Sequence, residues 1–112
     1  MQIESTELPG NITRLSLTGR LDMDGTQAIE QKFAFQTTTR AGKYVVDLSG
    51  VSFLASIGIR MLITSARGQS GRGGKVVLAA PQPLVRNVLE TAGIDKLVPM
   101  VDSVEAAQAT LA

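Results

Sequence analysis

Two short apolar runs, Tyr44–Leu48 and Lys75–Ala80, constrain the fold more than any other feature of this sequence. Their paired valines suit strands that are buried on both faces of a sheet. Between the two runs, apolar residues recur at the i, i+3, i+4 and i+7 spacing of one helix face: Ile59, Leu62, Ile63 and Ala66. A strand, a helix and a second strand in this order predict a parallel pair joined by a crossover helix.

The remaining segments extend this alternation. Period-two patterns and flanking turn residues predict three further strands, at Ile3–Leu8, Asn11–Thr18 and Leu97–Val101. We expect loops at Gly19–Asp22 and Arg40–Lys43, and a flexible glycine-rich loop at Gly68–Gly74.

Helix signals occur at four places. The predicted helices are Gly25–Thr37 capped by Asp24, Ser56–Arg67 ended by Gly68, a helix opened by Pro81–Pro83 and stopped at Gly93, and a last helix capped by Ser103. The order is therefore β-β-α-β-α-β-α-β-α, without a linker or an internal repeat. We predict one α/β domain over residues 1–112, with a mixed, largely parallel sheet of about five strands and about four helices.

Composition excludes several classes of function. Charged residues make up 19% of the 112 residues and the net charge is +1, so neither disorder nor a nucleic-acid-binding field is indicated. The chain has no cysteine and no histidine, which removes disulfides, thiolate chemistry, the usual zinc sites and a Ser-His-Asp triad. We therefore expect no enzyme activity, no metal and no cofactor.

The N-terminus and the hydropathy pattern favour a cytoplasmic protein. Met1–Pro9 lacks the basic start and apolar run of a signal peptide. No stretch approaches the roughly 20 apolar residues that span a bilayer. We expect neither a membrane nor a nucleic acid among the partners.

The segment Gly68–Lys75 superficially resembles a phosphate-binding loop. It carries Gln69 where that motif needs glycine, and Val76 where it needs serine or threonine. It also leads into a strand, whereas a phosphate-binding loop leads from a strand into a helix. A flexible connector is the interpretation we adopt.

Ser56 begins the helix that follows the first apolar run. Its hydroxyl either caps the helix or accepts a phosphate, because a helix N-terminus tolerates an anion well. Ile57, Met61 and Thr64 follow at i, i+4 and i+7, on a helix face predicted to be exposed unless a neighbouring loop covers it. Gly58 would let another surface approach closely.

Three blocks of the sequence carry a family resemblance: Leu17–Asp22, Val46–Phe53 and Ser56–Ile59. They are similar to the Leu-Thr-Gly-x-Leu-Asp, Asp-Leu-Ser-x-Val-x-Phe and Asp-Ser-[Ser/Thr]-Gly-Leu-Gly blocks of the STAS domain. The chain resembles, in particular, the small single-domain bacterial anti-sigma factor antagonists. The resemblance implies a STAS-like fold and covers nearly the whole chain.

The resemblance implies partner switching. The unphosphorylated antagonist binds an anti-sigma factor that is also a serine kinase, and phosphorylation of the serine matching Ser56 releases it. A PP2C-type serine phosphatase resets the cycle. The residues expected to contact the partner are Asp22, Ile57, Gly58, Arg60, Met61 and Thr64.

The sequence departs from the family pattern beside Ser56. Ala55 replaces the family's aspartate, Ile57 its second hydroxyl residue and Arg60 its second glycine. Arg60, one helical turn after Ser56, is predicted to pair with a phosphate there, or else to be a solubilising surface residue. The missing aspartate leaves a second function open: an interaction or ligand-sensing module of another signalling or transport assembly, not phosphorylated efficiently.

Overall fold

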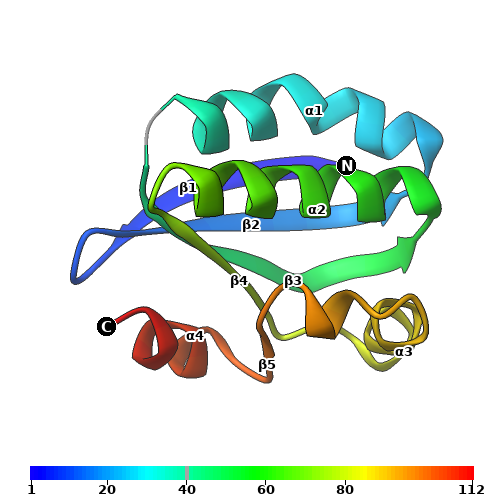
Figure 1. Cartoon of the computed structure of the whole chain (residues 1–112). Coiled ribbons are helices and arrows are strands. Elements are labelled where there is room, and N and C mark those ends of the chain that lie inside the picture. Colours follow the sequence, from blue (N-terminus) through cyan, green and yellow to red (C-terminus); the bar gives the residue numbers. More distant parts are fainter. Residues whose placement is uncertain (40) are drawn as a thin grey trace.

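The computed structural model describes residues 1–39 and 41–112, so Arg40 in the predicted turn lies outside the described residues. Within that part the chain forms five strands, four α-helices and one short 3-10 helix (Figure 1). In chain order these are β1 (Gln2–Leu8), β2 (Ile12–Leu21), α1 (Met23–Thr38), β3 (Lys43–Leu54), α2 (Ser56–Gly71), β4 (Lys75–Ala79), α3 (Pro83–Thr91), η1 (Ile94–Lys96), β5 (Met100–Val101) and α4 (Val104–Leu111).

The strands form one sheet in the order β1-β2-β3-β4-β5. β1 and β2 are antiparallel and joined by a tight turn, in which Gly10 has φ 86° and Asn11 has φ 60°. The pairs β2–β3, β3–β4 and β4–β5 are parallel. The predicted mixed, largely parallel sheet is therefore confirmed.

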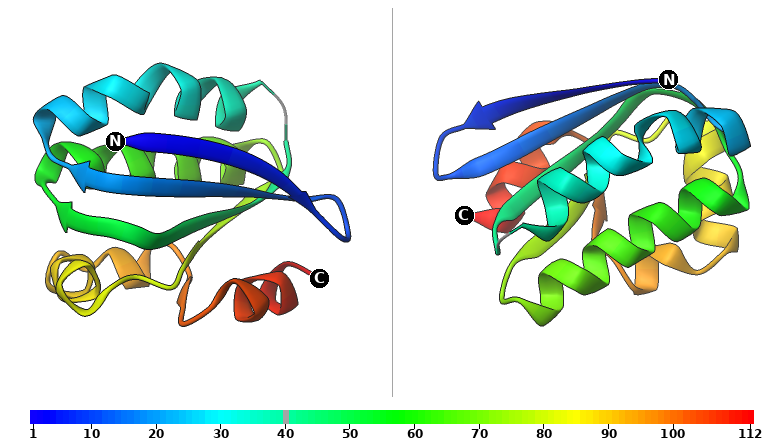
Figure 2. Two further views of the ribbon diagram at one scale, coloured as in Figure 1. Left: turned by 180° about the vertical axis from the view of Figure 1, so that it is seen from behind. Right: turned by 90° about the horizontal axis from the view of Figure 1, so that it is seen from above.

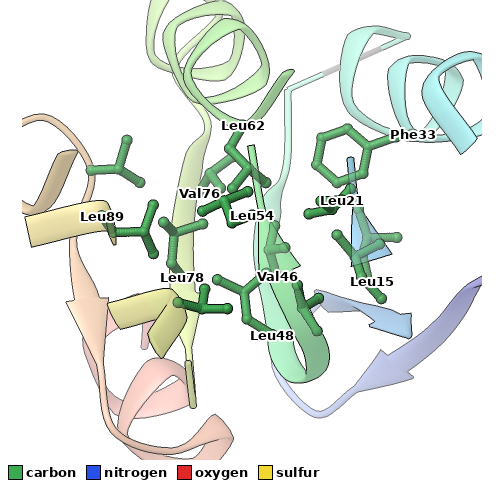
Figure 3. Close-up of a cluster of buried hydrophobic side chains, with 14 of the residues drawn as sticks. Leu15, Leu21, Phe33, Val46, Leu48, Leu54, Leu62, Val76, Leu78 and Leu89 are labelled. Carbon is green, nitrogen blue, oxygen red and sulfur yellow. The ribbon is translucent and has the colours of Figure 1, made fainter. Parts of the chain in front are cut away.

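The helices cover the sheet in two layers. Figures 1 and 2 show α1 and α2 side by side on one face of the sheet. Val85 and Leu89 of α3 belong to the same core cluster as Phe33 and Leu62, whereas α4 packs against a separate cluster on the opposite face. The main core lies where α1 and α2 meet the strands, and Figure 3 shows Phe33 and Leu62 directed towards strand residues such as Leu21 and Val76. A second, smaller cluster lies under α4 and includes Val45, Val77 and Leu111.

The C-terminal predictions are mostly confirmed. α3 begins with a proline in its first turn, and Gly93, with φ 75°, lies just beyond its end. The Ser103 side chain caps α4 by accepting a hydrogen bond of 3.0 Å from the Ala106 N–H. β5 is shorter than predicted, with two residues.

The strands β2 and β3 are much longer than predicted. The expected loop at Gly19–Asp22 is wrong, because β2 continues to Leu21, and β3 continues beyond Leu48 to Leu54. Pairing between the two strands persists through two register shifts, next to Thr18 and between Gly19 and Arg20. Such irregularities bend a strand without ending it, and Gly19 adopts a φ of 120° that few other residues reach.

The helix α2 also departs from prediction. It continues through Gly68, the expected stop, to Gly71, so only three residues are left for the predicted flexible loop. The predicted core stripe does face the core: Leu62 is buried, and Ile59, Ile63 and Ala66 are partly buried and pack against the same cluster. Ser65 and Gln69, which were not predicted, are buried as well.

Gln69 explains why the helix continues. Its fully buried amide donates to the Thr37 carbonyl of α1 and accepts from the Gly42 N–H at 2.9 Å. The Gln69 backbone carbonyl accepts from the Gly74 N–H at 2.8 Å. One side chain and its carbonyl therefore tie together the end of α1, the start of β3 and the turn before β4, which outweighs the helix-breaking tendency of Gly68.

We predict that Gln69→Leu lowers the free energy of unfolding by about 1–3 kcal/mol, because it leaves the buried Thr37 carbonyl and the partly buried Gly42 N–H without these hydrogen bonds. Urea denaturation followed by circular dichroism measures this change. Gln27→Leu, an exposed position on α1, is the matched control and should change the stability by less than about 0.5 kcal/mol. Equal effects of the two substitutions would contradict the role of Gln69.

Candidate functional site

The candidate site lies where β2 and β3 end and the next helices begin. Leu21 and Leu54 are register partners at the ends of these parallel strands. The Ala55 N–H donates to the Leu21 carbonyl at 2.9 Å, so the two chain segments stay together beyond the last paired residues. Asp22 and Ser56 therefore lie on the same rim of the sheet.

Ser56 is exposed and is the first residue of the 16-residue helix α2. The N-cap residue is Ala55, with extended backbone at φ −100° and ψ 171°, and it makes no side-chain cap hydrogen bond. The interpretation of Ser56 as an ordinary cap is therefore wrong. Among the residues that the structure describes, its hydroxyl has no hydrogen-bond partner.

Gly58 is buried, and this corrects its expected role. A Cβ at this position would lie 2.9 Å from Leu54 Cδ1 and 3.0 Å from Leu21 Cβ. The surface that approaches Gly58 closely thus belongs to the strands of the same chain. Gly58 holds the first turn of α2 against the ends of β2 and β3, and so positions Ser56, but it offers no surface to a partner.

Ile57, Met61 and Thr64 line a groove of about 220 Å³ between α1 and α2, together with Phe33 and Ala34 of α1. Thr64 is exposed as predicted, whereas Ile57 and Met61 are partly buried, which is closer to the alternative that a neighbouring segment covers them. Their neighbour across the groove is the helix α1, whereas the sequence suggested a loop.

Arg60 is exposed and contributes to the same groove. The ion pairs found in residues 1–39 and 41–112 are Arg14–Asp47, Arg20–Asp22 and Arg86–Asp102. Arg60 therefore has no acidic partner within that part of the chain. It is a free cation one helical turn beyond Ser56.

Asp22 has a structural role that the sequence assigned to Asp24. It is the N-cap of α1, and its Oδ1 accepts from the Gly25 N–H at 2.8 Å. This hydrogen bond, followed by the Arg20 guanidinium, holds the pKa of the Asp22 carboxyl below its ordinary value of 3.8. A Cβ on Gly25 would lie 1.9 Å from the Arg20 carbonyl oxygen, so a side chain there would displace this cap.

Sequence reasoning missed Arg20 and Phe53. The Arg20 guanidinium lies 4.3 Å from the centre of the Phe53 ring, and its Nε is 3.5 Å from Asp22 Oδ2. The ring and the carboxylate together fix the guanidinium at the rim. The two residues are register partners on β2 and β3, a relation that no local sequence pattern reveals.

The described part of the chain provides little for other chemistry. Across residues 1–39 and 41–112, no three acidic side chains converge in the way that a metal ion requires. In the same residues, no helix combines the length and the apolar character needed to cross a bilayer.

Comparison with known proteins identifies the family. Residues 4–101 match the family model described as "Mlab, STAS domain", and the chain therefore belongs to the STAS domain family. It is 29% identical over 93 residues to BtrV of Bordetella bronchiseptica, which carries the description of a putative anti-sigma factor antagonist. The match covers 83% of this chain and 80% of BtrV.

Solved structures agree with this assignment. The structure of an anti-sigma factor antagonist from Mycobacterium paratuberculosis is 26% identical, with a TM-score of 0.82 over 98% of this chain and 94% of the other. A Thermotoga maritima structure that is 17% identical has a TM-score of 0.89 over 97% of this chain and 93% of the other. The second likeness shows the fold alone.

We predict that Asp22→Ala lowers the melting temperature more than Asp22→Asn, because only the amide can still accept from the Gly25 N–H. The folded-state pKa of Asp22 is lowered, so its ionisation stabilises the fold above the ordinary value of 3.8. That stabilisation is lost as the pH falls from 3.8 through the lower folded-state value. In thermal melts across pH, the difference in melting temperature between wild type and Asp22→Asn should therefore disappear as the pH falls below 3.8. A difference that stays constant with pH would contradict this account.

Proposed function

We propose that this chain is an anti-sigma factor antagonist that binds its anti-sigma factor through the rim around Ser56 and is released when Ser56 is phosphorylated. The observation that carries the proposal is the exposed Ser56 hydroxyl, which Ala55 frees from the capping role. The descriptions of BtrV and of the mycobacterial structure support the general role.

The docking surface comprises, in this proposal, the residues around the first turns of α2: Asp22, Ser56, Ile57, Arg60, Met61 and Thr64. We call it the Ser56 surface. The partly buried Ile57 and Met61 offer a preformed apolar groove, which costs little to order on binding. Arg60 and the capping carboxylate of Asp22 provide charges at its border.

The partner is an anti-sigma factor with serine kinase activity, and a PP2C-type serine phosphatase removes the phosphate. The nucleotide and its magnesium ion belong to the kinase. Cytoplasmic localisation follows from these partners, since transcription is regulated there.

Phosphorylation acts locally on the Ser56 surface. It adds a charge of about −1.5 to −2 at pH 7, which the N-terminus of a helix accommodates, so the fold is retained. The same dianion must be desolvated when a partner covers the groove, at a cost of several kcal/mol. Because about 1.4 kcal/mol is a tenfold change in affinity, this cost is sufficient to release the partner.

The assignment of Ser56 is tested by intact-mass measurement after incubation with the cognate kinase and ATP. Wild type should gain one phosphate and Ser56→Ala none, while Ser70→Ala, an exposed hydroxyl further along α2, should behave as wild type. In a pull-down, Ser56→Ala should retain the partner and Ser56→Asp should bind it at least tenfold more weakly. A phosphate that still appears on Ser56→Ala would overturn the assignment.

Arg60 is the second element of the switch, because it can pair with a phosphate one helical turn away. An exposed pair of this kind contributes about 0.2–1 kcal/mol. We predict that Arg60→Ala raises the second pKa of phospho-Ser56 in a phosphorus NMR titration and alters phosphorylation and partner release. Arg67→Ala, an exposed arginine on the same helix, should leave all three unchanged. If Arg60→Ala also leaves them unchanged, Arg60 is a solubilising residue.

A second function is favoured by Ala55, which stands where the family has an aspartate. The chain would then be an interaction or ligand-sensing module that is not phosphorylated efficiently, with the groove between α1 and α2 as the binding site. Absence of phosphate on wild type, with a kinase that phosphorylates a standard antagonist, would favour this function over the first.

A further inference from the structure

We propose that the chain associates with a second copy of itself through β1, forming a two-fold dimer with a sheet continuous across both copies. β1 is the outermost strand and pairs with β2 alone in the described part of the chain, as Figure 2 shows. Its backbone groups on the other side are thus available for a further strand. The inference does not depend on Ser56 or on the proposed function.

β1 lacks most of the usual protections of an edge strand. Exposed edges are commonly blocked by proline, charged side chains (above all lysine), a bulge or very short length. The charged residues of β1 are Glu4 and Glu7, which do not face each other when two copies of the strand pair about Ser5. β1 has seven residues without proline or lysine, and its register with β2 runs from Gln2 to Leu8 without a shift. The opposite edge of the sheet, β5, is short, with two residues.

An exposed aromatic residue lies beside this edge. A groove of about 270 Å³ runs between β1 and α1, lined by Ile3, Ser5, Gln31, Lys32, Phe35 and Gln36. Phe35 is 69% exposed, the highest value among the exposed large apolar residues of the described chain. A large aromatic side chain at a free strand edge is typical of an interaction surface.

The sequence of β1 fits an antiparallel copy of itself. When the two strands pair about Ser5, Glu4 lies opposite Thr6 of the second copy, and Ile3 lies opposite its Glu7. Pairing centred on Glu4 would instead set two carboxylates against each other, which destabilises a sheet. The register about Ser5 avoids every such clash along the strand and satisfies two-fold symmetry.

The same register creates a charge pair with α1. Ile3, Ser5 and Glu7 alternate onto the face of β1 that α1 covers, since Ile3 and Ser5 line the groove with Lys32. Glu7 of the second copy, opposite Ile3, thus enters the groove beside Lys32. Within one copy, the described residues contain no ion pair between Glu7 and Lys32, and the Glu7 carboxylate accepts a hydrogen bond of 3.1 Å from Thr13 of β2.

This charge complementarity, repeated twice by symmetry, is why the occupant is a second copy of the chain. One strand and one side of a helix bury less than a standard interface of about 1,600 Å², so the dimer is weak and concentration-dependent. In sedimentation equilibrium from about 10 µM to about 1 mM, the weight-average mass should rise from 11.8 kDa towards twice that value.

Single substitutions locate the interface. Phe35→Glu and Lys32→Glu should each weaken dimerisation at least tenfold, because both put a charge against Glu7 of the second copy. Lys96→Glu, an exposed position on η1, makes the same change in net charge as Lys32→Glu and should dimerise as wild type. Phe35 and Lys32 are exposed, so the variants should remain folded, which circular dichroism measures.

A charge swap makes the test specific. Combining Lys32→Glu with Glu7→Lys should restore dimerisation to within about threefold of wild type, because the pair is re-formed with opposite signs. A wild type that stays monomeric at about 1 mM would overturn the proposal. So would a Lys32→Glu variant that dimerises as Lys96→Glu does, or a double variant without recovery. Ser56→Ala should dimerise as wild type does.

Discussion

The parallel pairing of β2 with β3 is the constraint on which the rest of the structure depends. It runs from Ile12 and Lys43 to Leu21 and Leu54, and continues in the hydrogen bond from Ala55 to Leu21. Because both strands end at the same rim, the helices that follow them must begin side by side. The position of Ser56 is therefore a consequence of the sheet. Gly58, which has no side chain, lets the first turn of α2 pack closely against the strand ends.

An ion pair between a buried aspartate and a partly exposed arginine holds the same two strands together further down. Asp47 of β3 is almost fully buried and accepts from Arg14 of β2 at 2.6 Å and from the Ser49 N–H at 3.0 Å. Burial raises the pKa of the Asp47 carboxyl, but the hydrogen bonds from Ser49 and Arg14 outweigh it and keep the pKa below the ordinary value. A carboxylate that stays charged in this way disfavours any other β2–β3 register, since a slip would take Arg14, its partner on β2, away from the buried charge.

Local patterns predicted the order of elements and the Ser103 cap, because each depends on residues close in sequence, and the alternation of strands and helices then implied the mixed sheet. The errors occur where distant contacts decide the outcome. Gly68 does not end α2 because Gln69 is bonded to α1, and Asp24 is not the cap because Gly25 must lie against the Arg20 carbonyl. The sequence placed Asp22 and Ser56 on the same rim of the sheet. It did not reveal that Ala55 occupies the N-cap position or that Arg20 stacks on Phe53, because both depend on how β2 and β3 are aligned.

Ala55 acquires a physical meaning once the cap is known. An aspartate in its place would carry a carboxylate beside the first N–H groups of α2 and would repel a phosphate on Ser56. Alanine leaves those N–H groups without a side-chain acceptor, and Arg60 has no acidic partner in the described chain. Both departures from the family pattern favour negative charge at Ser56. In the proposed switch, they stabilise the phosphorylated form and so shift control towards the phosphatase that must remove the phosphate.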